Sequence, residues 1–262
     1  MSNQNFSIKV DVIIPNFNKG IYLKEAINSV IQQTYKNWNL FIVDDNSKDS
    51  SKKILKNYSK NKKINIFYLK KNKGPGYCRN FAISKSKSKL IAFLDSDDFW
   101  TKDKLKSQII YMKKNKLSFT YTDYISFYQN GTIKKIIGKT NVSKNFNFSS
   151  FIKNTSINTS TMIVYRELIK SIKFKNLKKL EDYIFKCEIF KKNNKMYAVK
   201  FNKPTAYYRL IKNARSTNKL KNIYYLWKYN KVYNKLNIIQ NLISISMISI
   251  NSFKKYGFKM GV

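Results

Sequence analysis

Short, uninterrupted apolar runs alternate with stretches of helical periodicity over residues 10–94. Aliphatic runs predict buried strands, and apolar residues that recur every three or four positions predict helices. The predicted strands are residues 10–14, 40–43, 64–69 and 90–94, and the predicted helices lie around residues 23–31, 51–58 and 77–86. Continuous apolar strands that alternate with helices indicate a mostly parallel sheet covered by helices on both faces.

The pattern becomes more mixed after residue 98. Alternating residues on both sides of Asn130-Gly131 predict a β-hairpin. The other predicted elements are a helix near residues 105–112, strands at residues 161–165 and 196–201, and a helix at residues 181–190. Because no repeat or low-complexity linker interrupts residues 1–220, we expect one compact domain with two parts, 1–98 and 99–220.

The last segment, residues 221–262, carries a long amphipathic pattern. From Tyr225 to Ile250 apolar residues recur every three or four positions, while Asn, Gln and Ser interrupt the pattern and lysines flank it. A basic amphipathic helix can lie in a membrane interface. The same pattern also suits a helix, or a pair of helices, packed on the core. Both interpretations stay open, since periodicity does not distinguish lipid from protein as the partner.

The composition adds a strong positive charge. The 262 residues include 52 Lys+Arg and 14 Asp+Glu, a formal net charge of +38. A basic face suits nucleic acid. However, the lysines are spread along the chain among abundant Asn and Ile, which is typical of a coding bias, and we favour that explanation over a specific nucleic-acid site. Such a surface should in either case attract anionic lipid headgroups.

Several classes of protein are excluded or disfavoured. The chain has no histidine, which excludes Ser-His-Asp catalysis and His-ligated zinc. Cys78 and Cys187 are far apart in sequence, so we expect free thiols in a reducing cytoplasm. We expect neither a signal peptide nor a membrane span, because the first residues are polar and no stretch of ~20 residues is nearly all apolar.

Three predicted strands end in polar turns. These turns are Pro15-Asn16-Phe17-Asn18, Asp44-Asp45-Asn46-Ser47 and Asp95-Ser96-Asp97-Asp98. Ligands of open parallel sheets bind at the carboxyl ends of the strands, so we expect the three turns to form one site.

Asp95-Ser96-Asp97-Asp98 is the strongest of these signals. Alternate residues of an extended segment lie on the same side, so Asp95 and Asp97 are placed to hold one hard cation, which prefers carboxylate oxygens. The alternative is a set of capping aspartates before the helix near Lys102. We favour the metal site, because aspartates are scarce in this chain.

The turn at Asp44 and a further loop at Gly74 are weaker signals when each is considered alone. Asp44-Asp45-Asn46-Ser47 fits either an Asx-turn or the recognition of a base or ribose. Gly74-Pro75-Gly76 precedes a predicted helix that carries Arg79, a residue type suited to a phosphate, but the spacing is not that of a Walker loop.

In this order, the motifs resemble glycosyltransferase family 2 with the GT-A fold, a Rossmann-like sheet. The matching segments are residues 12–18, 42–47, 74–80 and 93–98, and a looser match continues through Leu180-Glu181-Asp182 and Tyr208-Arg209. The resemblance implies an inverting, metal-dependent glycosyltransferase whose residues 1–98 bind the nucleotide and whose residues 99–220 bind the acceptor.

The family's site residues carry over as follows. Asp95 and Asp97 would hold ribose and the divalent metal, Mn²⁺ or Mg²⁺, and Asp45 would meet the base, usually uracil. Glu181-Asp182 resembles the acidic pair that supplies the catalytic base, and we choose Asp182; on a purely structural interpretation the pair caps a helix. The implied donor-binding residues are Pro15, Phe17, Asn18, Asp45, Gly74, Arg79 and Asp95.

Two departures from the family pattern matter. The histidine that often follows the Tyr-Arg pair is absent after Tyr208-Arg209, and Lys212 or Arg215 would contact the diphosphate instead. The Q-x-x-R-W motif of processive synthases is also absent, which favours transfer of a single sugar.

The expected reaction is transfer from a nucleotide-sugar, expected to be UDP-linked, to a hydroxyl of a cell-surface glycan or lipid-linked acceptor at the cytoplasmic face of the plasma membrane. The alternatives are a nucleotidyltransferase of sugar-nucleotide metabolism and a non-enzymatic, basic nucleic-acid-binding protein. The first usually needs a Gly-rich loop near the first strand, and the second leaves the aspartates at the strand ends unexplained.

Overall fold

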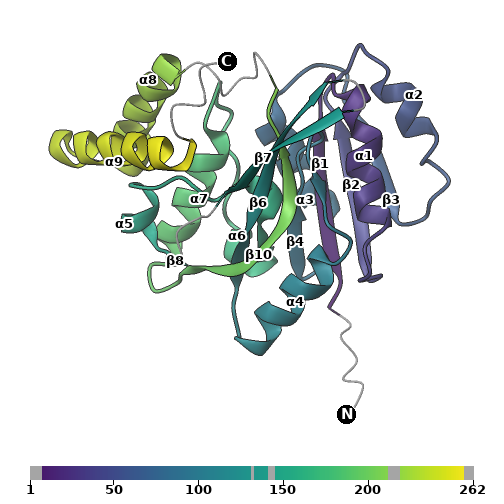
Figure 1. Cartoon of the computed structure of the whole chain (residues 1–262), viewed down its shortest axis with the longest axis horizontal. Coiled ribbons are helices and arrows are strands. Elements are labelled where there is room, and N and C mark those ends of the chain that lie inside the picture. The colour runs from purple at the N-terminus through teal and green to yellow at the C-terminus, as the bar shows by residue number, and fades with distance from the viewer. Residues whose placement is uncertain (1–7, 131–132, 141–144, 212–218, 257–262) are drawn as a thin grey trace.

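A ten-stranded sheet with helices on both sides forms the centre of the protein in a computed structural model that describes residues 8–130, 133–140, 145–211 and 219–256 (Figure 1). The strand order is β3-β2-β1-β4-β9-β6-β10-β5, with β7 paired to β6 and β8 paired to β10. Strands β3, β2, β1 and β4 are mutually parallel, and β10 is parallel to β6, whereas β9 is antiparallel to both β4 and β6. The predicted parallel arrangement is therefore confirmed for β1 to β4, but the sheet of the described residues is mixed, since five of its nine strand pairings are antiparallel.

The strands are β1 (Val10–Asn16), β2 (Trp38–Asp44), β3 (Ile64–Tyr68), β4 (Leu90–Phe93), β5 (Phe99–Trp100), β6 (Phe119–Asn130), β7 (Ile133–Thr140), β8 (Asn145–Phe146), β9 (Ile163–Tyr165) and β10 (Ala198–Arg209). The helices are α1 (Gly20–Ile31), α2 (Ser51–Lys56), α3 (Pro75–Lys85), α4 (Lys104–Lys114), α5 (Phe148–Phe151), α6 (Arg166–Ile169), α7 (Glu181–Lys192), α8 (Lys219–Tyr229) and α9 (Ile238–Tyr256), with a 3₁₀ turn η1 (Thr159–Thr161) and a π turn η2 (Asn230–Asn234).

Burial explains why the first strands are uninterrupted runs of aliphatic residues. Every residue of β1 is buried, because β1 lies between β2 and β4 and helices cover both faces of the sheet. Such a strand has no solvent-facing side, so apolar residues occupy consecutive positions instead of alternating ones. The predicted strands and helices of residues 10–94 are confirmed, with small differences at their ends.

Two predicted strands differ from those observed. The predicted strand at 196–201 is in fact β10, which continues to Arg209 through shifts of register around Pro204. Proline has no N–H for the ladder, and an irregular register accommodates it within a strand. The predicted strand at 161–165 begins only at Ile163, because Thr159–Thr161 form η1. The hairpin is confirmed by the β6–β7 pairing of Asn130 with Ile133, and its turn lies outside the described residues.

The C-terminal segment forms a helical extension rather than one long helix. Helices α8 and α9 are joined through η2 and lie beside α7 and α5, at the left in Figure 1 and far from β3 and α2. No helix of the described ranges is long and apolar enough to cross a membrane. The predicted boundaries at residues 98 and 220 remain predictions, and the sheet runs without a break through both parts of the domain.

One buried carboxylate joins the start of β1 to the turn before β4. The Asp11 side chain accepts hydrogen bonds from the backbone N–H groups of Lys87 and Ser88 at 2.9 and 2.7 Å and from the Ser88 hydroxyl at 2.7 Å. Its Oδ2 also lies 3.5 Å from Arg166. Asp11 therefore fixes how β4 enters the sheet beside β1.

We expect Asp11→Ala to lower the free energy of unfolding by about 3 kcal/mol, because buried N–H and hydroxyl donors lose their acceptor. Urea denaturation followed by circular dichroism measures the change. Asn65→Ala, at a half-buried position of β3, is the matched control and should cost less than about 1 kcal/mol. Equal losses in the two variants would contradict a specific role for Asp11.

Candidate active site

The polar turns predicted from the sequence do meet at one edge of the sheet. The Asn16 side chain, at the end of β1, donates to Asp44 at the end of β2 over 2.8 Å, and the N–H of Asp45 donates to the Asn16 carbonyl. The N–H of Leu94, after β4, donates to the Ile13 carbonyl. The carboxyl ends of three neighbouring parallel strands are thus held in register, as expected of a ligand-binding edge.

The Arg79 guanidinium joins the two halves of this site. It is buried on α3, and its two terminal nitrogens lie 2.6 Å from Asp95 Oδ1 and 3.3 Å from Glu181 Oε1. Burial alone would lower the pKa of Arg79, but the negative charges of Asp95, Glu181 and Asp182 outweigh it and raise that pKa. Arg79 therefore stays charged and holds the end of β4 against the start of α7.

Two glycines shape the start of α3, and the second of them lies close to α7. Gly74 precedes α3 with φ of 84°, a conformation that favours glycine. At Gly76 a Cβ atom would lie 3.2 Å from the Lys175 carbonyl oxygen and 3.3 Å from Glu181 Cγ. These contacts are tighter than usual, so a side chain at Gly76 would require the segment before α7 to shift slightly.

The three aspartates after β4 have different environments. Asp95 and Asp97 are partly exposed, whereas Asp98 is buried. Asp98 accepts hydrogen bonds from the Ser160 hydroxyl at 2.6 Å and from the N–H of Arg209 at 3.0 Å. Burial and the neighbouring charges of Asp97 and Asp95 raise the pKa of Asp98 well above its usual range. Asp98 is therefore a structural anchor, and the two other carboxylates face the site.

Arg209 fixes the other side of this loop. From the end of β10, its Nε donates to the Asp97 carbonyl at 2.8 Å, and its terminal nitrogen pairs with Glu25 on α1 at 2.5 Å. Its guanidinium also lies 4.3 Å from the centre of the Tyr22 ring. Arg209 thus ties the aspartate loop to α1 and β10 and limits the positions that Asp97 can adopt.

Asp95 and Asp97 fit a divalent metal of the hard type. Their oxygens are suitable ligands, and a Mg²⁺-like ion commonly takes one or two carboxylates and completes its shell with substrate phosphates and water. The Asp97 side chain is 24% exposed and pairs with the Lys19 ammonium at 2.8 Å, a cation that a metal would replace. The described part of the chain has no cluster of three or more Asp, Glu or Cys residues suited to a metal, so the fit relies on oxygens from the substrate.

Asp182 lies at the first turn of α7 and faces solvent on one side. Its carboxylate is 2.6 Å from the Lys186 ammonium and accepts from the Thr159 hydroxyl at 3.1 Å; the Lys186 side chain is only 2% exposed, against 36% for Asp182. Desolvation would raise the pKa of Asp182, but Lys186, Arg79 and Thr159 together hold it well below its usual range. Asp182 is therefore ionised at neutral pH.

Glu181 and Asp182 lie in the first turn of α7, where their charge favours the helix dipole as the structural interpretation expected, but neither makes a capping hydrogen bond. The residue that caps α7 is Leu180, with φ of 57°, and no side chain donates or accepts a capping hydrogen bond there. Glu181 bonds to Arg79 and Asp182 to Lys186 and Thr159. The positive φ of Leu180 is uncommon for a residue with a side chain and marks a sharp turn of the backbone directly before α7.

Asp44 and Asp45 are both committed to structural contacts. Asp44 accepts from the N–H of Ser47 at 3.0 Å, which makes the Asx-turn that the sequence allowed. The two oxygens of Asp45 accept from the N–H groups of Lys73 and Gly74, each at 2.7 Å. Asp45 thus holds the loop before α3 in place, and its contact with a base remains a prediction.

The remaining predicted donor residues lie along the same edge. Pro15 is buried within β1, whereas Phe17 is exposed beyond its end. Asn18 has φ of 50°, and its side chain accepts from the N–H of Lys48 at 2.8 Å. Lys212 and Arg215, predicted to contact a diphosphate, lie outside the described residues.

Sequence reasoning missed four residues that the structure brings into the site. Lys19 and Lys186 pair with carboxylates, and Thr159 and Ser160 of η1 donate to Asp182 and Asp98. A spacing signal existed only for Lys186, which stands four positions after Asp182 on one helix face. Lysines are so frequent here that the spacing alone carried little information.

Sequence comparison places the chain among known proteins. The profile of the family described as Glycosyl transferase family 2 matches residues 11–172. The chain is 31% identical over 253 residues to the putative teichuronic acid biosynthesis glycosyltransferase TuaG of Bacillus subtilis, covering 96% of this chain and 98% of that one. It is 33% identical over 251 residues to an Escherichia coli protein, covering 95% of both chains; that protein is named UDP-Glc:alpha-D-GlcNAc-diphosphoundecaprenol beta-1,3-glucosyltransferase WfgD.

Solved structures show the same fold. The Staphylococcus aureus TarS fragment 1-349, in complex with UDP-GlcNAc, superposes with a TM-score of 0.70 at 20% identity, covering 95% of this chain and 73% of that one. The mannosyltransferase PcManGT of Pyrobaculum calidifontis, in complex with GDP-Man and Mn²⁺, superposes with a TM-score of 0.65 at 12% identity, covering 91% and 69%. The predicted GT-A fold is confirmed.

We expect Lys186→Met to raise the pKa of Asp182, because the substitution removes the closest positive charge while burial continues to favour the protonated form. A titration of the Asp182 carboxyl carbon by ¹³C NMR measures the change. Lys192→Met, an exposed position at the end of α7, is the control and should leave that pKa unchanged. An unchanged pKa in Lys186→Met would contradict the assigned cause.

The same pair makes stability depend on pH. Because the folded pKa of Asp182 lies below its unfolded value of about 4, the pair stabilises the fold above about pH 4, and this contribution is lost as the pH falls toward the folded pKa. Denaturation midpoints of wild type and Lys186→Met should therefore converge at acid pH. A constant difference between them down to about pH 2 would contradict the linkage.

Proposed function

The chain belongs to glycosyl transferase family 2, and we propose that this glycosyltransferase is inverting, metal-dependent and non-processive, with Asp182 as its catalytic base. The single observation that carries the proposal is the bridge of Arg79 between Asp95 and Glu181. The bridge supports the proposal because it joins Asp95, which we propose as a metal ligand, to Glu181, the residue next to the proposed base Asp182. One site of this kind can hold both substrates of a transfer reaction.

In the proposed donor half, charged side chains would bind the metal and diphosphate, and an aromatic ring would contact the base. Asp97 and Asp95 would hold Mn²⁺ or Mg²⁺, and a bound metal neutralises the charge that develops on the leaving nucleoside diphosphate. Lys19, which pairs with Asp97, lies where it can turn toward a diphosphate once a metal takes its place. Phe17 offers an exposed ring at the end of β1 that suits stacking on a base.

The acceptor half supplies the base. Asp182 accepts the proton of the acceptor hydroxyl as its oxygen attacks the anomeric carbon from the face opposite the leaving diphosphate. One displacement inverts the configuration and needs no covalent intermediate. Lys186 and Thr159 hold the Asp182 carboxylate in one orientation, and the low pKa that Lys186 imposes keeps it ionised and ready to accept.

A base with a depressed pKa is a weak one, and this constrains the transition state. Proton transfer to Asp182 becomes favourable only after the attacking oxygen has lost electron density to the anomeric carbon, so the proton moves late. The arrangement suits a displacement in which the bond to the diphosphate breaks ahead of proton transfer to Asp182. The neutralising groups on the donor side then matter more for the rate than the strength of the base.

The relatives narrow the substrates that we propose. The names of WfgD and of a second E. coli relative, WfaP, specify UDP-glucose and a GlcNAc-diphosphoundecaprenol acceptor, and the TarS fragment holds UDP-GlcNAc. We therefore propose a UDP-linked hexose or N-acetylhexosamine as donor and a lipid-linked glycan of surface polysaccharide assembly as acceptor. The enzyme would work at the cytoplasmic face of the plasma membrane as a peripheral protein.

Calorimetry with UDP-, GDP- and CMP-sugars, each with and without Mn²⁺, tests the donor site. We expect a UDP-sugar to bind only with metal, and Asp97→Ala to weaken this binding about tenfold or more. Glu167→Ala, in α6, is the control and should bind like wild type. Metal-independent binding of equal strength in wild type and Asp97→Ala would overturn the metal site.

Asp182→Asn tests the base. The variant should retain donor affinity within about twofold but lose about 10²–10⁴-fold in turnover, because the amide keeps the size of the side chain and cannot take the proton. Glu188→Gln, on the same helix, is the control and should keep normal turnover. Near-normal turnover in Asp182→Asn would move the role to Glu181 or another group.

A further inference from the structure

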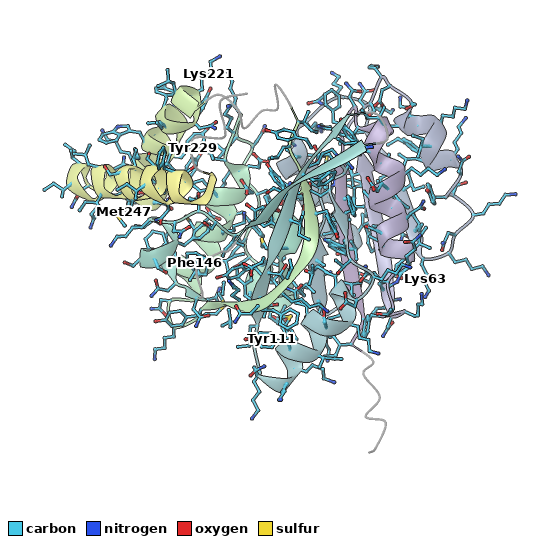
Figure 2. The ribbon with its side chains drawn as sticks, viewed as in Figure 1. Lys63, Tyr111, Phe146, Lys221, Tyr229 and Met247 are labelled. Carbon is cyan, nitrogen blue, oxygen red and sulfur yellow. The ribbon has the colours of Figure 1, made fainter. Side chains whose placement is uncertain are left out.

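Helix α9 exposes its apolar face to solvent and turns polar side chains toward the core, the reverse of an ordinary surface helix. Its outer face carries a row of exposed aliphatic side chains, with Ile239 69% and Leu242 54% exposed. We call this row the outer stripe, and its members recur every three or four residues: Ile239, Leu242, Ile243, Met247 and Ile250. A surface helix normally turns such residues toward the core. In Figure 2, Met247 lies on α9 at the margin of the molecule.

The inner face of α9 instead carries polar groups with defined partners. Ser244 is fully buried and donates to the Ile152 carbonyl at 2.6 Å, and Asn251 donates to the Lys153 carbonyl at 3.0 Å. Asn241 is buried and donates to the Trp227 carbonyl at 3.0 Å. The half-buried side chains of Ile245 and Ile248 add apolar contact with the core. These hydrogen bonds fix the rotation of α9 about its axis, and this rotation turns the outer stripe toward solvent.

The charge pattern around the stripe is equally uneven. Residues 236–253 contain no charged side chain, although the chain has 52 Lys+Arg among its 262 residues. Exposed lysines stand on the elements next to it, namely Lys221, Lys228, Lys231 and Lys235. An uncharged apolar face next to cationic side chains matches the layers of an anionic bilayer, in which headgroups lie above acyl chains.

Charge decides which occupant fits the stripe. Two copies of a chain with a net charge of +38 repel each other, so a second copy gains apolar contact against a long-range opposing force. An anionic lipid surface offers the same apolar contact and attracts that charge. A helix that binds lipid through one apolar face lies parallel to the membrane surface.

We propose that the outer stripe of α9 is a membrane-docking surface that inserts into the interface of an anionic bilayer. Apolar side chains of α8 extend the same surface: Leu220, Ile223 and Tyr224 are exposed. The stripe supplies the depth of insertion, and the adjacent lysines supply the preference for anionic lipid. Docking itself does not depend on the proposed function, and only its use in presenting a lipid-linked acceptor rests on that function.

The extension is attached to the helix that carries the base. The Tyr183 hydroxyl donates to Asn230 at 2.7 Å, and the Lys191 ammonium donates to the Tyr233 carbonyl at 2.6 Å. Asn230 in turn donates to Asn241 and Ser244 of α9, each at 3.0 Å. A continuous chain of buried hydrogen bonds thus runs from α7 to the inner face of α9. Docking through the stripe would set the height and tilt of Asp182 above the bilayer.

Vesicle flotation of the full chain, without nucleotide or acceptor, tests the docking surface. The test variant is Ile239→Ser/Ile243→Ser/Ile250→Ser, which changes exposed positions whose loss leaves the core intact. With vesicles of phosphatidylglycerol and phosphatidylethanolamine, we expect about tenfold weaker partitioning of the variant than of wild type. At about 1 M salt, wild type should keep part of its binding and the variant should keep none, because salt screens only the charge.

Two controls make the result specific. Ile110→Ser/Tyr197→Ser removes exposed apolar residues of α4 and of the turn before β10, and should float like wild type. Equal flotation of the stripe variant and wild type at both salt concentrations would overturn the proposal, since charge alone would then hold the protein. Circular dichroism melting should give the same midpoint for the stripe variant and wild type.

A second measurement separates the bilayer from a second copy. Sedimentation velocity without vesicles should give a monomer for wild type and variant alike. A wild-type dimer that the stripe variant dissociates, with unchanged flotation, would assign the stripe to self-association and overturn the proposal. With acceptor present, the variant should lose transfer to a lipid-linked acceptor in vesicles but keep transfer to a short-chain soluble analogue. Loss of both would instead point to a defect in the transferase site.

Discussion

The buried guanidinium of Arg79 is the contact on which the site depends. It holds Asp95, at the end of β4, and Glu181, at the start of α7, within 2.6 and 3.3 Å of its two terminal nitrogens. Without a cation between them, these carboxylates would repel each other across a region with little water, and α7 would have to move away. Gly76 suits this close packing, because a Cβ there would lie only 3.2 Å from the Lys175 carbonyl oxygen. The contact thus holds the proposed donor side and the proposed acceptor side of the site at one edge of the sheet.

Pairs of a carboxylate and a cation also organise the rest of the site. In a chain with a net charge of +38, several carboxylates of the site each pair with a cation: Asp97 with Lys19, Asp182 with Lys186, and Glu25 with Arg209. Each pairing fixes the direction of a carboxylate before any substrate arrives. The fixed directions lower the cost of organising the site during catalysis. The positive charge of the chain is thus used locally for positioning, and across the surface it favours anionic partners.

The C-terminal extension is held in place by hydrogen bonds between uncharged groups. Its interior is built from amide and hydroxyl groups, among them Asn230, Asn241 and Ser244, and its outside is aliphatic. Buried hydrogen bonds of this kind depend on direction more than apolar contacts do, so they specify one rotation of α9. These bonds link the proposed membrane contact to α7, which carries the proposed base Asp182. If docking occurs as proposed, the acceptor's height above the bilayer and the position of Asp182 are set by one rigid assembly.

The sequence by itself determined the sheet of residues 10–94, since strands buried on both faces must be continuously apolar, and it determined that the polar turns at Pro15, Asp44 and Asp95 share one edge. It also determined the family, because motif order survives without any knowledge of contacts. Only the tertiary structure decided which carboxylates face the site and which are anchors. Asp97 and Asp98 are adjacent and chemically identical. Yet the Asp97 side chain is partly exposed, whereas Asp98 is buried and accepts a hydrogen bond from Ser160, a residue 62 positions away. The rotation of α9 was undecided for the same reason: a helical period shows that two faces differ, but the partner of each face comes from residues distant in the chain.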